Sequence, residues 1–170
     1  SVRASLSQQV KNTASLPHDI AIALARDVEE VALPMLEHSR ALTDSDLLEL
    51  VQSTESSTRH LAIATREHVP EKVADTLITR GNDKIAAALV DNPGAELSDK
   101  GMARIVERFP ENKPLMSALV SRPHLPATIA EKLIAHVSDS LAKTLKERHK
   151  LPDKDIEKQV EETREGETLK

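Results

Sequence analysis

The chain has 170 residues, a formal net charge of −5 at pH 7 and no cysteine. Because cysteine is absent, disulfides, thiolate catalysis and cysteine-based metal sites are excluded. Phe109 is the single residue of the Phe, Tyr and Trp class, and a core of aliphatic side chains favours closely packed helices over a β-sandwich. The acidic balance disfavours bulk binding to nucleic acid or to anionic membranes, but it is compatible with a local basic ridge.

No apolar run in the sequence approaches the roughly 18 to 20 residues of a membrane span, and residues 1–16 lack the continuous apolar stretch of a signal peptide. We therefore expect a cytoplasmic protein that does not contact a membrane. The first residue is Ser1 and not Met, which leaves open whether the chain is a fragment of a longer protein.

Residues 1–15 are predicted to form an N-terminal capping helix with Leu6 and Val10 as its apolar residues. Residues 16–150 are predicted to form a repeat array, because an apolar residue followed by Pro, Thr or Ser recurs at regular intervals. The opening residues are Leu16, Leu42, Val69, Leu97, Leu125 and Leu151, which lie 26, 27, 28, 28 and 26 residues apart.

Apolar positions recur inside each repeat at the spacing of two amphipathic helices. The first helix carries two apolar residues, eight and nine positions after the opening residue. The second helix carries two apolar residues that are four positions apart. The first-helix pairs are Leu24/Ala25, Leu50/Val51, Leu77/Ile78, Ile105/Val106 and Leu133/Ile134, with Ile20, Val73 and Ile129 upstream in three repeats. The second-helix pairs are Ala32/Leu36, Ile85/Leu89, Leu115/Leu119 and Leu141/Leu145, and Arg59/Ile63 is the weakest case.

The residues between these helices fit helix ends. Pro, Thr or Ser after the opening residue suits a helix start, and acidic residues follow where the helix dipole is positive. A single pair of short helices cannot bury its apolar face alone, so neighbouring pairs must stack. We predict an all-α fold, a right-handed superhelix or solenoid of about six short HEAT-like helix pairs. Residues 151–170 are mostly charged and are predicted to be a polar C-terminal cap or a linker.

Three ordered blocks of sequence resemble a known bacterial family. They are "LPHDIAIALARDVEEVALPMLEHSRALTDSDLLELV" (16–51), "NPGAELSDKGMARIVERF" (92–109) and "SRPHLP" (121–126). The resemblance is to domain of unknown function 2336, over roughly residues 16–135, and the repeats are also similar to the leucine-rich-repeat-variant and HEAT-like class. It implies a cytoplasmic bacterial helical-repeat protein and provides no catalytic residues to transfer.

Cations recur shortly before the repeats begin, and the residues concerned are Arg40, Arg66, His68, Arg122, His124 and Arg148. If the repeats stack in register, these side chains form a basic ridge along one edge. One interpretation is that the ridge binds a phosphate, a nucleotide or an acidic partner helix. The other, which is favoured, is that the cations only satisfy helix carbonyls and the negative ends of helix dipoles.

No catalytic or metal-binding motif is found in the sequence. The seven histidines form no HExxH motif, and the four glycines form no GxGxxG, Walker or GxSxG motif. We therefore predict a protein that is not an enzyme and that has no cofactor and no metal. Gly94 lies in the longest turn between repeats and is predicted to adopt a left-handed conformation, which would mark a bend in the superhelix or a binding notch.

These observations predict a non-catalytic scaffold or adaptor whose concave helix face binds another protein. The alternative is a sensor that binds a nucleotide or another phosphate-bearing ligand through the basic ridge. Nucleic-acid binding along the same ridge is disfavoured by the acidic charge and by the lack of aromatic side chains for stacking.

Overall fold

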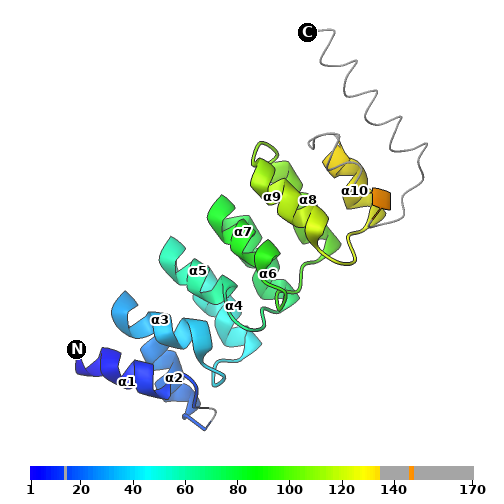
Figure 1. The fold of residues 1–170 in the computed structure, drawn as a ribbon. Helices are drawn as coiled ribbons and strands as arrows, with labels where there is room; N and C mark the ends of the chain where they lie inside the picture. Colours follow the sequence, from blue (N-terminus) through cyan, green and yellow to red (C-terminus); the bar gives the residue numbers. More distant parts are fainter. Residues whose placement is uncertain (14, 135–145, 148–170) are drawn as a thin grey trace. The chain divides into compact units, whose positions relative to one another are not determined.

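A computed structural model describes residues 1–13, 15–134 and 146–147 of the chain. Within these residues the protein is all-helical, without β-strands, as predicted (Figure 1). The chain consists of two compact units, unit 1 (Ser1–Ser98) and unit 2 (Asp99–Lys170). The helices are α1 (Val2–Val10), α2 (His18–Ala25), α3 (Glu29–His38), α4 (Asp44–Gln52), α5 (Ser57–Ala64), α6 (Glu71–Arg80), α7 (Asp83–Asp91), α8 (Asp99–Arg108), α9 (Lys113–Ser121) and α10 (Ala127–Ile134).

The first helices of successive pairs begin at the spacing that the opening residues predict. Helices α2, α4, α6, α8 and α10 begin at residues 18, 44, 71, 99 and 127, which are 26, 27, 28 and 28 residues apart. The second helix expected after α10, with the pair Leu141/Leu145, lies outside the described residues, as does the segment 151–170.

Side chains at the helix starts explain why the helices begin where they do. At α4, the Thr43 hydroxyl accepts a hydrogen bond from the Asp46 N–H at 3.2 Å, and the Asp46 carboxylate accepts one from the Thr43 N–H at 2.7 Å. Asn82 and Asn112 cap α7 and α9 with their side-chain oxygens. Each such cap stabilises a helix by about 1 kcal/mol.

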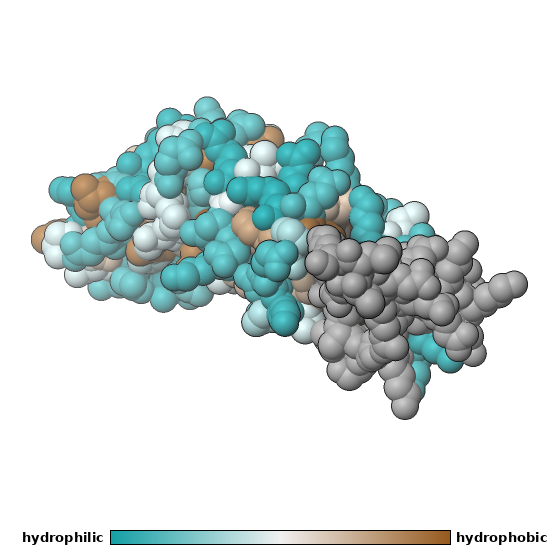
Figure 2. Space-filling view, turned by 90° about the horizontal axis from the view of Figure 1, so that it is seen from above, coloured by the Kyte–Doolittle hydropathy of each residue, from teal (hydrophilic) through white to brown (hydrophobic). Residues whose placement is uncertain are grey.

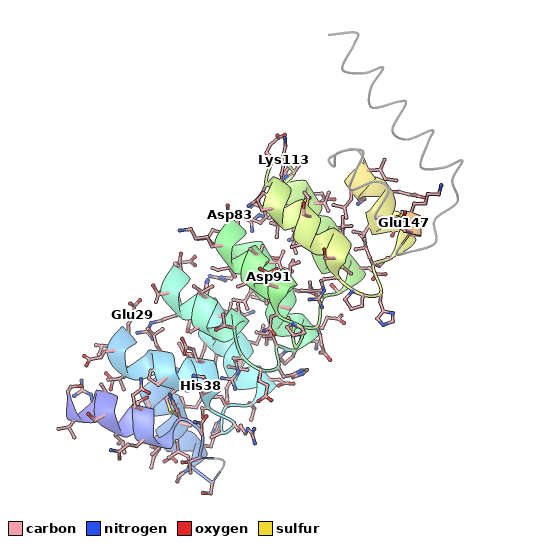
Figure 3. All side chains as sticks on the ribbon, in the orientation of Figure 1. Glu29, His38, Asp83, Asp91, Lys113 and Glu147 are labelled. Atoms are coloured by element: carbon pink, nitrogen blue, oxygen red, sulfur yellow. The ribbon has the colours of Figure 1, made fainter. Side chains whose placement is uncertain are left out.

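In unit 1 helix α1 and the second helices of the pairs form a row. Helices α1, α3, α5 and α7 pack against one another in this order, and Figure 1 shows them side by side. Figure 3 labels the two ends of α3, Glu29 and His38, and the two ends of α7, Asp83 and Asp91. On the other side of this row, α4 packs closely against α6 but has little backbone contact with α2. The first and second helices of each pair therefore occupy two layers.

The core lies between these layers, and the predicted first-helix pairs fill it. All five pairs from Leu24/Ala25 to Leu133/Ile134 are buried, as are the second-helix pairs Ala32/Leu36, Ile85/Leu89 and Leu115/Leu119. Ile20 is the exception, since 42% of its surface is exposed. Its expected place in the core is wrong, because α2 packs closely on α3 but has little contact with α1 or α4.

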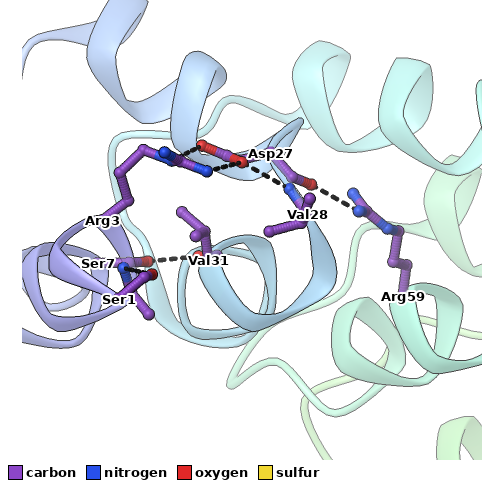
Figure 4. A network of polar contacts seen from close by, with 8 residues as sticks. Ser1, Arg3, Ser7, Asp27, Val28, Val31 and Arg59 are labelled. Atoms are coloured by element: carbon purple, nitrogen blue, oxygen red, sulfur yellow. Dashed lines mark hydrogen bonds and ion pairs between the residues drawn. The ribbon is translucent and has the colours of Figure 1, made fainter.

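Helix α1 packs on α3 through small side chains. Ala4 and Ser7 are its buried residues, whereas Leu6, one of the two apolar residues of the predicted capping helix, is 45% exposed. The Ser7 hydroxyl donates a 2.6 Å hydrogen bond to the Val31 carbonyl, and Arg3 forms an ion pair with Asp27 (2.9 Å) (Figure 4). These two contacts fix the rotation of α1, so Leu6 points away from α3.

Unit 2 repeats the same construction over a shorter described range. Helix α10 packs against α8 and α9, and Ile105, Leu119 and Leu133 are fully buried there. The guanidinium of Arg108 lies 4.8 Å from the centre of the Phe109 ring, which is a cation–π arrangement.

None of the helices in the described part of the chain is long and apolar enough to cross a membrane. The face of the molecule shown in Figure 2 is mostly hydrophilic, with hydrophobic residues in small separate groups.

Candidate functional site

Three residues of the predicted basic ridge lie together in unit 1. Arg40, Arg66 and His68 line a groove of about 620 Å³ between the α3–α4 loop and the α5–α6 loop. We call it the loop groove. Its apolar floor contains Leu42 and Leu47.

Within the loop groove, Arg66 is buried, with 9% of its surface exposed. Its Nη1 donates a 2.6 Å hydrogen bond to the Leu36 carbonyl and a longer one of 3.4 Å to the Met35 carbonyl, and its Nη2 donates to the Ser39 carbonyl. Burial lowers the pKa of the Arg66 guanidinium, and the Asp44 carboxylate partly opposes this. The group stays protonated, so Arg66 closes the C-terminus of α3 with a permanent charge.

The other charged side chains of the loop groove largely pair with one another. Arg40 lies 3.8 Å from Glu67, and His38 lies 3.3 Å from Glu37. His68 is exposed. Carboxylates thus stand beside Arg40, His38 and Arg66, which weakens the attraction of the groove for an anion.

The loops on this edge of unit 1 are joined by main-chain hydrogen bonds. The Val69 N–H donates to the Gly94 carbonyl at 3.0 Å, and the Glu96 N–H donates to the Val69 carbonyl at 2.9 Å. A Cβ atom on Gly94 would lie 1.8 Å from the Glu67 carbonyl oxygen. No described glycine has a positive φ, so the expected left-handed conformation of Gly94 is wrong. The position instead needs glycine because two backbones approach closely.

The remaining ridge residues belong to unit 2 or lie outside the described residues. Arg122 follows α9 as its C-cap residue and is half-buried, and burial lowers the pKa of its guanidinium. His124 is exposed and has a φ of 60°, which makes it the one described non-glycine residue in the left-handed region. Arg148 lies outside the described residues.

Several side chains that close helix ends were not singled out from the sequence. Asn92 donates from Nδ2 to the carbonyls of Ala64 (2.9 Å) and Arg66 (2.8 Å) at the end of α5. Arg59 donates to the carbonyls of Asp27 (2.6 Å) and Ala25 (3.4 Å) after α2. The polar side chain at the otherwise apolar position 59 is the signal that could have indicated this role.

A buried histidine closes the end of α4 in the same way. His60 is 1% exposed, and its Nε2 lies 3.0 Å from the Val51 carbonyl and 2.9 Å from the Thr54 carbonyl. A carbonyl only accepts, so Nε2 carries the hydrogen. No group of three or more His, Cys, Asp or Glu residues able to hold a metal ion occurs in the described part of the chain.

A further polar contact joins the first two helix pairs. The His18 Nε2 lies 2.6 Å from the Asp46 carboxylate. Burial by itself would raise the pKa of Asp46, but hydrogen bonds from the Thr43 N–H and from His18 outweigh it, so the pKa lies below its usual value. Asp46 therefore remains ionised at neutral pH as both a cap and an inter-helix partner.

Comparison with protein families places the sequence among bacterial proteins. The model of a family described as "Uncharacterised protein conserved in bacteria (DUF2336)" matches residues 31–170. This range includes most of α3, all of α4 to α10 and most of the loop groove. No curated protein and no solved structure matches the chain. Because the family model covers most of its length, the chain belongs to this bacterial DUF2336 family.

Proposed function

We propose that the protein is a non-catalytic helical-repeat scaffold that binds another protein in the bacterial cytoplasm. The observation that carries this proposal is the regular pairing of short helices, whose first members begin 26 to 28 residues apart and whose second members pack in a row in unit 1. We infer that further pairs continue this arrangement as a right-handed HEAT-like solenoid, with α1 as its N-terminal cap. Such arrays present an extended surface to partner proteins.

The charges of unit 1 favour a protein partner over a phosphate-bearing ligand. Each of its six arginines has a carboxylate or a backbone carbonyl as a partner, and the six are Arg3, Arg26, Arg40, Arg59, Arg66 and Arg80. A phosphate in the loop groove would have to replace the contacts of Arg40 and Arg66, and it would also face Glu37, Asp44 and Glu67. Replacing existing partners and adding like charges both reduce affinity for an anion.

A test of this proposal begins with capture of proteins from a lysate of the source bacterium on the full chain. Each captured protein is then purified and titrated against the chain by calorimetry. The proposal expects one protein that binds saturably in a fixed ratio. It is overturned if no purified protein binds above a control with an unrelated helical-repeat chain.

The sensor alternative makes a different prediction for the same chain. A phosphate-binding loop groove would raise the melting temperature when ATP or inorganic phosphate is added, and Arg40→Gln would remove the increase. We expect no such increase, and an increase that depends on Arg40 would replace the scaffold with the sensor.

A further inference from the structure

The four helices of the row in unit 1 carry an apolar residue at the same place on their solvent-facing sides. It is the fifth residue of α1, α3, α5 and α7, and the four residues are Leu6, Leu33, Leu61 and Ala87. Leu6 is 45% exposed and Leu61 is 39% exposed, while Leu33 and Ala87 are partly exposed. We call these four residues the apolar stripe. Unlike the buried leucines of the core, its leucines offer apolar surface to the solvent.

The packing of the helices places the stripe residues next to one another. Helices α1, α3, α5 and α7 pack in this order, and Figure 3 shows that α3 and α7 run in the same direction, from Glu29 to His38 and from Asp83 to Asp91. The hydroxyl of Ser56, which caps α5, donates a 2.7 Å hydrogen bond to Glu29 at the start of α3. Packed helices lie about 8–10 Å apart, so neighbouring stripe residues are separated by about this distance.

Carboxylates flank the stripe on both sides. Residues one turn before and one turn after a stripe residue lie on the same side of its helix. In α3 and α7 the flanking residues are mostly acidic, and they are Glu29, Glu30 and Glu37 around Leu33 and Asp83, Lys84 and Asp91 around Ala87. The corresponding residues of α5 are uncharged. In α1 the flanking Arg3 is already paired with Asp27. The surface around the stripe is therefore acidic.

The contacts that the α3 carboxylates already make are open to exchange. Glu29 accepts from an uncharged hydroxyl. Glu30 lies 3.5 Å from the N-terminal ammonium group, and Glu37 lies 3.3 Å from Nε2 of His38. In both pairs each partner has at least 42% of its surface exposed, and exposed pairs of this kind are weak. An arriving lysine or arginine can therefore replace or join these partners.

The distance between the two flanks matches the width of an α-helix. Glu29 and Glu37 are eight residues apart on α3, which at the rise of an α-helix is about 12 Å. A helix with its side chains is about 10–12 Å wide, so a helix that lies across the row fits on the stripe between the carboxylates. Two turns of such a helix span about 11 Å, which is close to the spacing of the stripe residues.

We propose that the apolar stripe binds a basic amphipathic helix of the partner protein, which lies across the row. This inference rests on the proposed scaffold function and specifies the surface and the chemistry of the partner. Apolar side chains on one side of the partner helix pack on the stripe, and lysines or arginines along its two edges face the carboxylates. The acidic flanks repel nucleic acid and anionic membranes, and a second copy of the chain would bring the same acidic flanks.

The composition of the chain makes the stripe simple to probe. The chain contains no Trp and no Tyr, so indole fluorescence in a mixture comes from the probe alone. The probe is a synthetic helical peptide of leucine and lysine, with leucine at positions i, i+3, i+4 and i+7 and one terminal tryptophan. One control peptide has glutamate in place of lysine, and the other has a shuffled order that spreads the leucines around the helix. Fluorescence anisotropy during titration with the full chain measures each Kd.

The lysine peptide should bind saturably and about tenfold more tightly than either control peptide. Leu61→Gln should weaken this binding by about tenfold, because it removes apolar contact at the middle of the stripe. Ile20→Gln is the matched control and should leave the Kd unchanged, since Ile20 is exposed to a similar extent, 42%, but lies on α2 outside the row.

The carboxylates give a second, independent pair of variants. Glu37→Gln should weaken binding of the lysine peptide by about two- to fivefold at low salt, and the difference should vanish at high salt. Glu49→Gln is its control, because Glu49 is also exposed and paired with a cation but lies on α4.

Several results overturn the proposal. Leu61→Gln without effect, or with the same effect as Ile20→Gln, overturns the assignment of the surface. Equal binding of the lysine and glutamate peptides overturns the basic character of the partner, and equal binding of the shuffled peptide overturns the amphipathic helix. Absence of binding of the lysine peptide overturns all three.

Failure of the scaffold function is a separate result. A captured partner protein that binds the Leu61→Gln chain as tightly as the unchanged chain would remove the apolar stripe as its site and leave the scaffold function standing. Binding of the lysine peptide that depends on Leu61, without any partner protein from the lysate, would leave the stripe standing and remove the scaffold.

Discussion

Arg66 and Arg40 line the same groove, but their side chains have different roles. Arg66 is buried and donates to carbonyls of α3, whereas 72% of the Arg40 side chain is exposed and it pairs with Glu67 at 3.8 Å. Sequence position predicted that both lie on one edge of the protein. Sequence position could not show that Arg66 is buried and Arg40 exposed, because burial depends on which loop folds over which helix end. Contacts between residues about 30 positions apart decide this.

Replacing Arg66 with alanine should therefore destabilise the protein strongly. The Leu36 and Ser39 carbonyls would lose a charged donor in a buried place, and we expect the free energy of unfolding to fall by about 2–3 kcal/mol. Urea denaturation followed by circular dichroism measures the change. Arg40→Ala is the matched control and should cost less than about 1 kcal/mol because its ion pair is exposed. Equal effects of the two substitutions would contradict the assigned role of Arg66.

The lowered pKa of Asp46 predicts the direction in which the free energy of unfolding changes with pH. The folded-state pKa lies below the unfolded value of about 3.9. Its contribution to stability is therefore fully present above the unfolded pKa and is lost as the pH falls through the folded pKa. The difference in unfolding free energy between the unchanged chain and Asp46→Asn should be about 1 kcal/mol at pH 5 and should shrink as the pH falls below about 4. A difference that grows as the pH falls below about 4 would contradict this assignment.

At the scale of helices and loops, the sequence predicts the helices better than the loops. Buried pairs such as Leu77/Ile78 and capping residues such as Thr43 are local signals, and both were predicted correctly. Ile20 shares the local pattern of Val73 but lacks a helix that covers it. Gly94 was assigned the wrong conformation, because its role depends on a carbonyl in a different loop. Contacts between distant segments leave no periodic pattern in the sequence.

The loop around Gly94 gives a prediction at this scale. Gly94→Ala would place a Cβ atom 1.8 Å from the Glu67 carbonyl oxygen, so the two loops must move apart and lose main-chain hydrogen bonds. We expect a loss of about 1–3 kcal/mol in unfolding free energy, measured by thermal and urea denaturation. Glu67→Ala, which keeps the carbonyl and removes only an exposed side chain, should stay within about 0.5 kcal/mol. An unchanged stability of Gly94→Ala would show that the loops are not in close contact.

Across the molecule, the helices of unit 1 are stabilised by neighbouring helices, both within the rows and across the layers. Helix α5 packs against α3 and α7 within its row and against α4 and α6 across the layers. Helix α1 buries only Ala4 and Ser7. In repeat proteins stability is approximately a sum of such nearest-neighbour terms. The protection of backbone amides against hydrogen exchange should therefore differ from helix to helix.

Amide hydrogen exchange followed by mass spectrometry measures these differences in protection between helices. We expect the peptides of α1 to exchange fastest among the helices of unit 1 and those of α5 slowest, because opening of α1 exposes little apolar surface. Ser7→Ala should accelerate exchange in α1 and leave α5 unchanged, since it removes the hydrogen bond to Val31. Equal protection of α1 and α5 would mean that unit 1 opens as one cooperative block.

The side chains that close helix ends also impose an order on folding during synthesis. Arg59 closes the end of α2, Arg66 the end of α3 and Asn92 the end of α5, and each donor stands 26 to 34 residues after its acceptor. A ribosome delivers the acceptor helix first, at roughly 5–20 residues per second. The ends of α2, α3 and α5 in a nascent chain must therefore wait seconds, with their last carbonyls bound only by water, until the later donor has emerged and closes them.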